Sequence, residues 1–309
     1  MHQNRWLLIF YGIYGSIKYM CKNLSFERGG SARMNAEEIR KLQLKSLETL
    51  QEFAKFCDDN FLRYYIIGGC LIGAVREGGF LAWDDDIDVF MPRPDYERLW
   101  RMWNSRGRFK LLRTTDRLNI RSQFMTLCDS ETTCVRRLTK DLPIPQGITM
   151  DIIPLDGAPY SRLSRMNQKR HAVLYSVYCL DMLPENHGGL SRFAARLLLM
   201  KPKWLKNRLR KRHERKMMRY NLTNCDYLTE LCSGLKYMGN EYPKEWFTST
   251  VPIKFEGMTL PAPAGYKKYL TAVFGDYMTP PDDSERTTDH GILFVDTERS
   301  YLDTLYGDE

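Results

Sequence analysis

The stretch that decides the fold reads GGCLIGAVREGGFLAWDDDIDVFMPR and occupies residues 68–93 of the chain. It opens on two glycines, passes through a short helical pattern and reaches four carboxylates within five positions, Asp84, Asp85, Asp86 and Asp88. Side chains of an extended segment alternate between its two faces at about 3.3 Å per residue. We therefore expect the first, third and fourth of these aspartates to share one face, while Ile87 and Val89 point into a core.

Carboxylates arranged in this way favour a bound cation. Charges about 7 Å apart repel each other by about 0.6 kcal/mol in water and by about 2 kcal/mol at an effective dielectric constant of 20. Oxygen ligands without a nearby cysteine or histidine favour Mg²⁺ or Mn²⁺ over zinc, and a metal with open coordination positions can hold the phosphates of a nucleotide. The pattern predicts Asp84, Asp86 and Asp88 as ligands of such a metal.

The order of elements around this stretch indicates a fold class. Apolar residues at helical spacing predict a helix over 37–58, and a β-type run at 64–67 ends at the two glycines. A helix over 70–76, the acidic strand and a helix over 92–104 follow, and an apolar strand over 148–154 carries one further aspartate. This order is typical of the nucleotidyltransferase fold. We expect an α/β (α+β) protein with a mixed sheet flanked by helices and a helical C-terminal half.

The further aspartate is Asp151, and burying its carboxylate in an apolar strand is costly unless charged partners surround it. We expect it to join the acidic run as another metal ligand, so that Asp86, Asp88 and Asp151 form the catalytic set. Metal ions held there would neutralise phosphates and orient an in-line displacement. An ion pair between Asp151 and an arginine is the alternative.

The two glycines form the predicted phosphate-binding element. Gly68 and Gly69 let a phosphate approach backbone N–H groups at a helix start, where the helix dipole also favours negative charge. Arg76 follows on the same predicted helix and is a candidate to clamp a phosphate. Its alternative is an exposed helix arginine without a binding role.

The composition describes a globular protein with an anionic partner or substrate. The 309 residues carry a net charge of +8, and 43% are hydrophobic while 27% are charged. This charge suits a nucleotide, a phosphorylated glycan, a membrane surface or nucleic acid, with a merely solvated basic surface as the alternative. The eight cysteines show no CxxC and no zinc-ligand spacing, which indicates reduced thiols in a cytosolic compartment.

Residues 1–33 form an extension before the recognisable pattern. Its apolar run at 6–20 is shorter than the roughly 20 residues that a membrane span needs. The run is therefore a weak membrane anchor, or the natural start is Met34. We divide the chain into this extension, a nucleotidyltransferase-like core over 34–160, and a helical region with a C-terminal segment over 161–309.

The remaining pattern predicts helices over 162–182 and 191–221, and a β-hairpin from runs at 120–128 and 132–138. Residues 201–219 combine many lysines and arginines with Trp, Leu and Met on the other helix face. Such a helix suits an anionic membrane surface, which predicts peripheral membrane contact for a cytoplasmic protein; a solvated helix packed on the core is the alternative. Nucleic acid is not expected, because aromatic residues do not interleave regularly with the basic ones.

These residues together resemble the LicD family. The blocks that carry the resemblance are 68–76, 79–80, 83–89, 91–93 and 95–96, then 151–157, and finally 255–257, 261, 266, 269–270, 274–277 and 280–281. The resemblance runs in order from about residue 34 to residue 290, and fukutin-type proteins share the same core. One departure is Phe274-Gly275, where a Tyr-Gly pair is more usual in the family.

The resemblance implies an activity and its substrates. LicD-like proteins transfer a phosphoalcohol, typically phosphocholine from CDP-choline, onto a sugar hydroxyl of a bacterial surface glycan such as lipopolysaccharide or teichoic acid, and related members use CDP-ribitol. Carried over to this chain, the resemblance makes Asp84, Asp86 and Asp88 metal ligands and Asp151 the carboxylate that completes the site. CMP is then the released product.

Two other classes of function stay open from the sequence. Glycosyltransferases also use an Asp-x-Asp motif to hold the metal of a nucleotide-sugar, and they release UDP or GDP instead of CMP. A non-catalytic glycan-binding or membrane-binding protein that keeps the fold is the third possibility.

Overall fold

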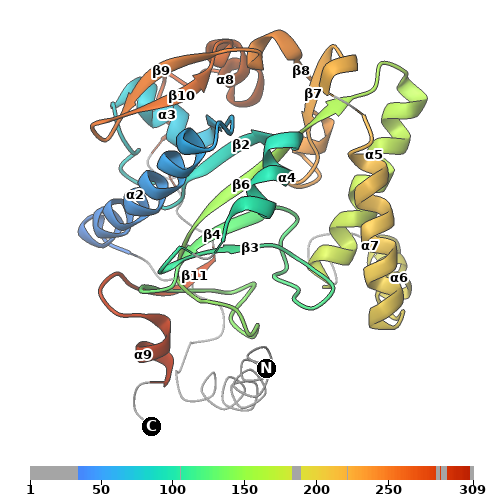
Figure 1. The fold of residues 1–309 in the computed structure, drawn as a ribbon, viewed down its shortest axis with the longest axis horizontal. Coiled ribbons are helices and arrows are strands. Elements are labelled where there is room, and N and C mark those ends of the chain that lie inside the picture. The colour runs from blue at the N-terminus through green and yellow to red at the C-terminus, as the bar shows by residue number, and fades with distance from the viewer. Residues whose placement is uncertain are drawn as a thin grey trace.

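The computed structural model describes residues 34–104, 106–182, 189–220, 222–282, 286 and 291–306. Figure 1 shows a central sheet with helices on its flanks, which confirms the expected α/β fold class. No helix within these ranges is both long and apolar enough to cross a membrane. The predictions for residues 1–33 lie outside the described residues.

The main sheet is mixed and has seven strands. Its principal order is β1-β2-β6-β4-β3, in which β2 and β6 run parallel and the other neighbours run antiparallel. Two further strands, β7 and β8, extend the sheet from the second half of β6. The strands span β1 Tyr65–Ile66, β2 Asp88–Pro92, β3 Phe109–Leu112, β4 Met125–Asp129, β6 Ile148–Ala158, β7 Tyr227–Glu230 and β8 Tyr242–Pro243.

Strand β6 is the centre of the sheet because both of its edges are paired. Its first half lies between β2 and β4, and its second half pairs with β7. A strand in this position is buried on both sides, which explains its nearly continuous apolar run. Met150, Ile152 and Leu155 are fully buried, and Asp151 between them is only partly covered.

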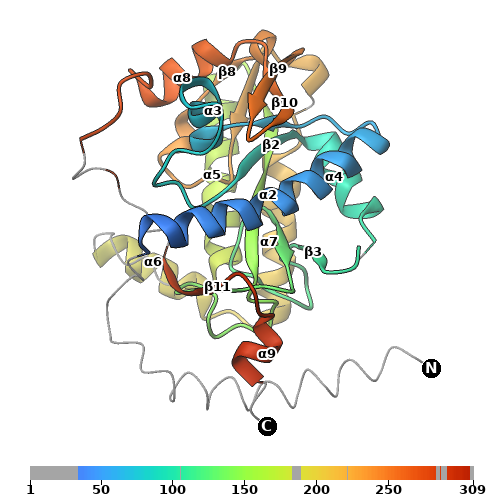
Figure 2. The same ribbon diagram turned by 90° about the vertical axis from the view of Figure 1, so that its left-hand side faces the viewer.

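Helices cover the two faces of the sheet. Helix α2 (Ala36–Asp59) begins with a capping box between Asn35 and Glu38 and packs against β6. Figures 1 and 2 together place α2 on one side of the sheet and the helix pair α5 (Arg162–Leu180) and α7 (Lys203–Met217) on the other. The predicted helices over 37–58 and 162–182 are thereby confirmed.

The other elements surround this sheet. Helices α3 and α4 follow β1 and β2, and the β9-β10 hairpin lies near α3. The small β5-β11 pair brings the C-terminal part of the chain beside residues 133–136. Their bounds are α3 Gly68–Arg76, α4 Arg93–Met102, β5 Thr133–Arg136, α6 Gly189–Leu199, β9 Thr250–Phe255, β10 Met258–Pro263, α8 Tyr266–Phe274, β11 Ile292–Asp296 and α9 Tyr301–Tyr306, with short 3₁₀ turns η1 Leu222–Asn224, η2 Tyr237–Gly239 and η3 Lys244–Phe247.

Two predictions about elements are wrong. The runs at 120–128 and 132–138 do not form a hairpin, because β4 pairs with β3 and β6 while β5 pairs with β11. The helix expected over 191–221 is divided into α6 and α7, with Pro202 as the N-cap of α7. The domain boundary at residue 160 stays a prediction, and the main sheet takes strands from both sides of it.

Each cysteine among the described residues is free. Cys128 and Cys134, which stand on β4 and β5, are both buried thiols. This agrees with the expectation of reduced cysteines for the part of the chain that the structure describes.

Candidate active site

The candidate site forms where the acidic run meets the central strand. Asp88 opens β2 and is the register partner of Asp151 on the parallel strand β6. The backbone N–H of Asp151 donates to the carbonyl of Ile87 at 2.8 Å, and the Thr126 hydroxyl donates to Asp151 Oδ1 at 3.2 Å. Two segments that are separated by more than 60 positions in the sequence thus place carboxylates side by side.

The acidic run alternates in burial as the sequence predicts. Asp84, Asp86 and Asp88 are partly exposed, whereas Ile87 and Val89 are fully buried. Regular strand pairing begins only at Asp88, so the preceding aspartates lie on an irregular segment that leads into β2. We call residues 84–87 the acidic loop.

Asp85 joins this group, although the sequence assigned it no role. Its side chain is 3% exposed, whereas those of its neighbours Asp84 and Asp86 are partly exposed. Carboxylate oxygens of Asp84, Asp85 and Asp86 nevertheless lie within 4.8 Å of one another. The acidic loop is therefore folded tightly enough to bring successive aspartates together, which a regular strand would not do.

The carboxylates of the acidic loop interact electrostatically with the site residues of β2 and β6. Burial raises the pKa of the Asp88 carboxyl well above its usual range, and the neighbouring carboxylates of Asp86, Asp151 and Asp84 raise it further. A nearby guanidinium, that of Arg136, acts in the opposite direction on this pKa. All four aspartates proposed as ligands thus form one electrostatic group.

Arg136 is a site residue that the sequence analysis missed. It stands at the end of β5, and the pKa of its guanidinium is raised because Cys134, Asp151 and Asp86 outweigh the opposing effect of burial. Its position depends on the pairing of β5 with β11, which joins residues 133–136 to residues 292–296. No local sequence signal marks this arginine, because the pairing is long-range.

The two glycines lie directly beside the acidic loop. Gly68 begins α3 with a φ of +56°, in the left-handed region that favours glycine, and a Cβ on Gly69 would lie 2.1 Å from Asp84 Oδ2. A side chain at position 69 would therefore displace the Asp84 carboxylate from its present place beside α3. Binding of a phosphate at Gly68 and Gly69 stays a prediction.

Arg76 is not the exposed helix arginine of the alternative interpretation. Its side chain is 7% exposed, and its guanidinium lies 5.9 Å from the Trp83 ring centroid and 3.4 Å from Glu77. A second guanidinium, that of Arg286, lies 4.8 Å from the same ring. Arg76 lines neither of the cavities described below, and its predicted role as a phosphate clamp is untested.

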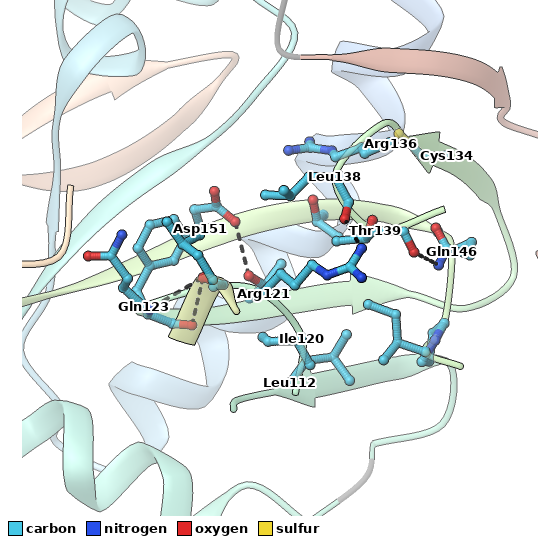
Figure 3. A pocket seen from close by; sticks show the side chains of 18 residues that line it. Leu112, Ile120, Arg121, Gln123, Cys134, Arg136, Leu138, Thr139, Gln146 and Asp151 are labelled. Atoms are coloured by element: carbon cyan, nitrogen blue, oxygen red, sulfur yellow. Dashed lines mark hydrogen bonds between the residues drawn. The ribbon is translucent and has the colours of Figure 1, made fainter. Parts of the chain in front are cut away.

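Two cavities meet at the carboxylates. The first has a volume of about 380 Å³ and is lined by Gly68, Asp86, Asp88, Asp151, Glu230 and Tyr269, among others. The second has a volume of about 250 Å³ and includes Arg121, Thr126, Arg136 and Asp151 in its lining. Figure 3 shows the second cavity, with Asp151 and Gln123 at one end and Gln146 at the other. Gln123, Phe124 and Asp151 line both cavities.

A neighbouring aspartate has a different role. Asp156 on the same strand is 1% exposed and accepts two hydrogen bonds from the buried Arg93 guanidinium, at 2.7 and 2.6 Å. An arginine ion pair of the kind considered for Asp151 is thus found at Asp156. Asp151 lines both cavities, and its carboxylate is close enough to Arg136 to raise the pKa of that guanidinium.

An Asp-x-Asp pair that leads into β2, a further aspartate on the parallel strand β6 and a Gly-Gly helix start beside them form the pattern expected of a nucleotidyltransferase fold. Residues 61–135 match the family described as "LicD/FKTN/FKRP, nucleotidyltransferase domain". The chain thus contains a LicD-type nucleotidyltransferase domain, and the resemblance to the LicD family noted from the motifs is confirmed.

A relative supports this assignment along most of the chain. The lipopolysaccharide cholinephosphotransferase LicD of Haemophilus influenzae is 27% identical over 256 residues. The aligned region covers 82% of this chain and 96% of that protein. The similarity therefore extends well beyond the nucleotidyltransferase domain.

Proposed function

We propose that this protein is a metal-dependent phosphotransferase that moves phosphocholine from CDP-choline onto a sugar hydroxyl of a bacterial surface glycan and releases CMP. Phosphotransferase as the enzyme class is supported by the named activity of the Haemophilus relative and by the LicD family match. The observation that carries the proposal is the pairing of Asp88 with Asp151 beside the acidic loop and between two cavities.

The residues of the site fit a hard divalent cation. The donors are carboxylate oxygens, and three of them lie within 4.8 Å of one another in Asp84, Asp85 and Asp86. Such donors suit Mg²⁺ or Mn²⁺. Burial raises the pKa of Asp88, and the carboxylates of Asp86, Asp151 and Asp84 raise it further, as is expected where several acidic groups share one site. A bound ion would neutralise phosphate charge and act as a Lewis acid on the reacting phosphorus.

The chain's own residues then have distinct tasks. Asp84, Asp86, Asp88 and Asp151 would hold the metal, which would fix the diphosphate of the donor where the two cavities share Asp151. Gly68 and Gly69 would let a phosphate of the donor approach the backbone N–H groups at the start of α3. The acceptor hydroxyl attacks the phosphorus distal to cytidine, and CMP leaves. Asp151 is assigned as a ligand, with general base for the hydroxyl proton as its alternative role.

Two cavities that share Asp151 suit a transfer between two substrates. A donor and an acceptor must approach one phosphorus from different sides for an in-line displacement. The shared lining of Gln123, Phe124 and Asp151 is where such substrates would meet. A phosphocholine donor and a lipopolysaccharide-type acceptor are the pair that the relative's name supports.

CMP release tests the function. Purified protein with Mg²⁺, CDP-choline and crude surface glycan is expected to release CMP and to label the glycan with choline. Asp86→Ala and Asp88→Ala are expected to lose this activity, whereas Asp59→Ala, an exposed aspartate at the end of α2, is the matched control. Release of UDP or GDP from a nucleotide-sugar instead would favour the glycosyltransferase, and wild-type turnover equal to that of Asp88→Ala would favour a non-catalytic protein.

We also propose that the junction of α6 and α7 contacts an anionic membrane. Four large apolar side chains are exposed there, at positions Phe193, Leu197, Met200 and Trp204. Lys203, Arg208, Arg212 and Arg215 are exposed along α7, while Lys206, Arg210 and Lys211 pair with acidic side chains. Exposed apolar residues beside a basic surface suit the interface of anionic lipid. This contact would place the protein at the inner face of the cell membrane, near lipid-linked acceptors.

Vesicle sedimentation tests the membrane contact. The full chain is expected to bind vesicles with anionic lipid more strongly than neutral vesicles, and added salt should weaken the binding. The substitutions Phe193→Ser and Trp204→Ser are expected to reduce it. Equal recovery with anionic and neutral vesicles would contradict the proposal.

A further inference from the structure

The first cavity contains a buried carboxylate that the proposed reaction does not use. Glu230 is the last residue of β7 and is 4% exposed. Its Oε1 accepts hydrogen bonds from the Tyr242 hydroxyl and from Asn240 Nδ2, the latter at 3.3 Å. Both donors are neutral, and no lysine or arginine of the described ranges forms an ion pair with it. Burial raises the pKa of Glu230, which reflects the cost of ionising this carboxyl without a cation.

Strand register places Glu230 on the same face of the sheet as the catalytic carboxylates. Glu230 is the partner of Leu155 on β6, four residues beyond Asp151. Residues that are an even number of positions apart on a strand have side chains on the same face. The Cα atoms of Asp151 and Leu155, four positions apart, are about 13 Å from each other. The side chains of Asp151, Ile153 and Glu230 accordingly line one cavity. Carboxyl groups from β6 and β7 thus line the same cavity.

Aromatic rings line this cavity together with the carboxyl groups. Tyr269 and Phe274 are 6.5 Å apart between ring centroids, with an interplanar angle of 85°. Both line the cavity, together with Tyr237 and Phe124. Burial raises the pKa of Tyr269 well above its usual range, and the carboxylates of Glu230 and Asp88 raise it further. This hydroxyl therefore lies near both carboxylates.

We propose that Glu230 and the rings of Tyr269, Phe274 and Tyr237 bind the quaternary ammonium of the transferred choline. This inference rests on the proposed function and names the subsite that selects the alcohol. A quaternary ammonium donates no hydrogen bond and is recognised by aromatic faces and a nearby negative charge. Glu230, a buried carboxylate without a basic partner, supplies the charge. The nearly perpendicular rings of Tyr269 and Phe274 supply the aromatic faces.

The dimensions of the cavity suit this assignment. In phosphocholine only an ethylene link separates the phosphate oxygen from the ammonium. A phosphate at Asp86, Asp88 and Asp151 therefore leaves the ammonium to point along the cavity towards Tyr269 and Glu230. A polyhydroxylated alcohol such as ribitol would face ring surfaces where its hydroxyl groups need partners, which costs binding free energy. The subsite thus favours choline over ribitol or glycerol as the transferred alcohol.

Comparing two donors distinguishes a loss of choline recognition from a loss of the reaction itself. CMP release from CDP-choline and from CDP-glycerol is measured for the wild type, for Glu230→Gln and for Phe274→Leu, with Glu245→Gln as the control on η3. Phe274 is 40% exposed, so its substitution is compatible with folding. Each subsite variant is expected to lower kcat/KM for CDP-choline by about tenfold or more and to leave kcat/KM for CDP-glycerol unchanged. An equal loss with both donors would overturn the proposal, while CMP release by the wild type would still support the function.

A binding measurement covers the case in which the reaction itself is wrong. Tetramethylammonium chloride is titrated into each protein by isothermal calorimetry, with sodium chloride at equal ionic strength as the reference. We expect binding to the wild type and to Glu245→Gln, and about tenfold weaker binding to Glu230→Gln. Equal affinity of all three proteins, or no binding by the wild type, would overturn the subsite whatever the activity assays show.

Discussion

Asp88 and Asp151 are register partners on the parallel strands β2 and β6. Neighbouring strands lie about 4.8 Å apart, so the backbones of these two residues are in direct contact and their side chains leave the same face. The proximity of Asp151, together with burial and Asp86, raises the pKa of Asp88. Two carboxylates in such a position repel each other unless a cation lies between them.

Asp151→Asn is expected to lower phosphocholine transfer by about 100-fold or more, since one charged ligand is lost from the site. In metal-free buffer the same variant should lose less stability than Asp156→Asn, because removing the repulsion with Asp88 offsets the lost attraction to Arg136. Asp156→Asn is the matched comparison, since it leaves the buried Arg93 without its principal partner and should cost about 3–5 kcal/mol of stability. Urea unfolding and CMP release, measured on both variants, give the two readouts. Strong destabilisation by Asp151→Asn would show that Asp151 is structural.

Mg²⁺ is expected to raise the melting temperature of the wild type. A ligand that binds only the folded state stabilises it by about 2.7 kcal/mol at a concentration of 100 times Kd. Asp88→Ala should abolish most of the shift, and Asp59→Ala, which lies far from the acidic loop in sequence, should retain it. Differential scanning fluorimetry with increasing MgCl₂, and with EDTA as the reference, measures the effect. An identical shift in all three proteins would indicate non-specific ion binding.

The carboxylates of the site were predictable because each stands in a strong local pattern. The acidic run has four aspartates between apolar residues, and Asp151 stands alone in an apolar strand. Each of these patterns requires charged partners nearby. Arg136 and Glu230 carry no such pattern. Their places depend on the pairing of β5 with β11 and of β7 with β6, which join distant segments. Long-range pairing is not encoded in the spacing of either residue.

The incorrect prediction of a hairpin from the runs at 120–128 and 132–138 also results from long-range pairing. The run that became β4 was correctly expected as a strand, and its neighbour in sequence became β5. Both edges of β4 are taken, by β3 on one side and by the central strand β6 on the other. The tight connection typical of hairpins predicts adjacency only when an edge is free. β4 pairs with β6, the buried central strand, and local periodicity in the sequence does not reveal which strand takes that central place.

Gly69→Ala is expected to reduce activity more than stability. The added Cβ would lie 2.1 Å from Asp84 Oδ2, so the Asp84 carboxylate must move away from its present position. Displacing a metal ligand should weaken Mg²⁺ binding, while the helix α3 gains a residue of higher helical propensity. Gly239→Ala is the matched control, because its Cβ would meet no atom within 4 Å of the described structure. The Mg²⁺ dependence of CMP release compares the two, and equal activity of both variants would contradict the packing argument.

The pair His171 and His213 predicts how stability depends on pH. Their Nδ1 atoms are 2.8 Å apart, so one ring must donate and the other accept. Burial lowers the pKa of His213 to about 4, with further lowering by His171, Arg212, Arg170 and Lys216. A base with a lowered pKa binds fewer protons when folded, so its contribution to stability is complete above its unfolded pKa of about 6.5 and is lost as the pH falls towards about 4.

Acidification from pH 6.5 to pH 4 should therefore destabilise the wild type more than His213→Asn. Asparagine keeps a hydrogen-bonding group beside His171 but has no proton to gain in this range. Carboxylates elsewhere titrate in both proteins, so the informative quantity is the difference in unfolding free energy between wild type and variant at each pH. That difference is expected to shrink steadily below pH 6.5, because the unfolded wild type takes up a proton on His213 that burial and the charges of Arg212, Arg170 and Lys216 keep off the folded protein until about pH 4. A constant difference across the range would show that His213 titrates alike in the folded and unfolded chain, and would contradict the lowered pKa.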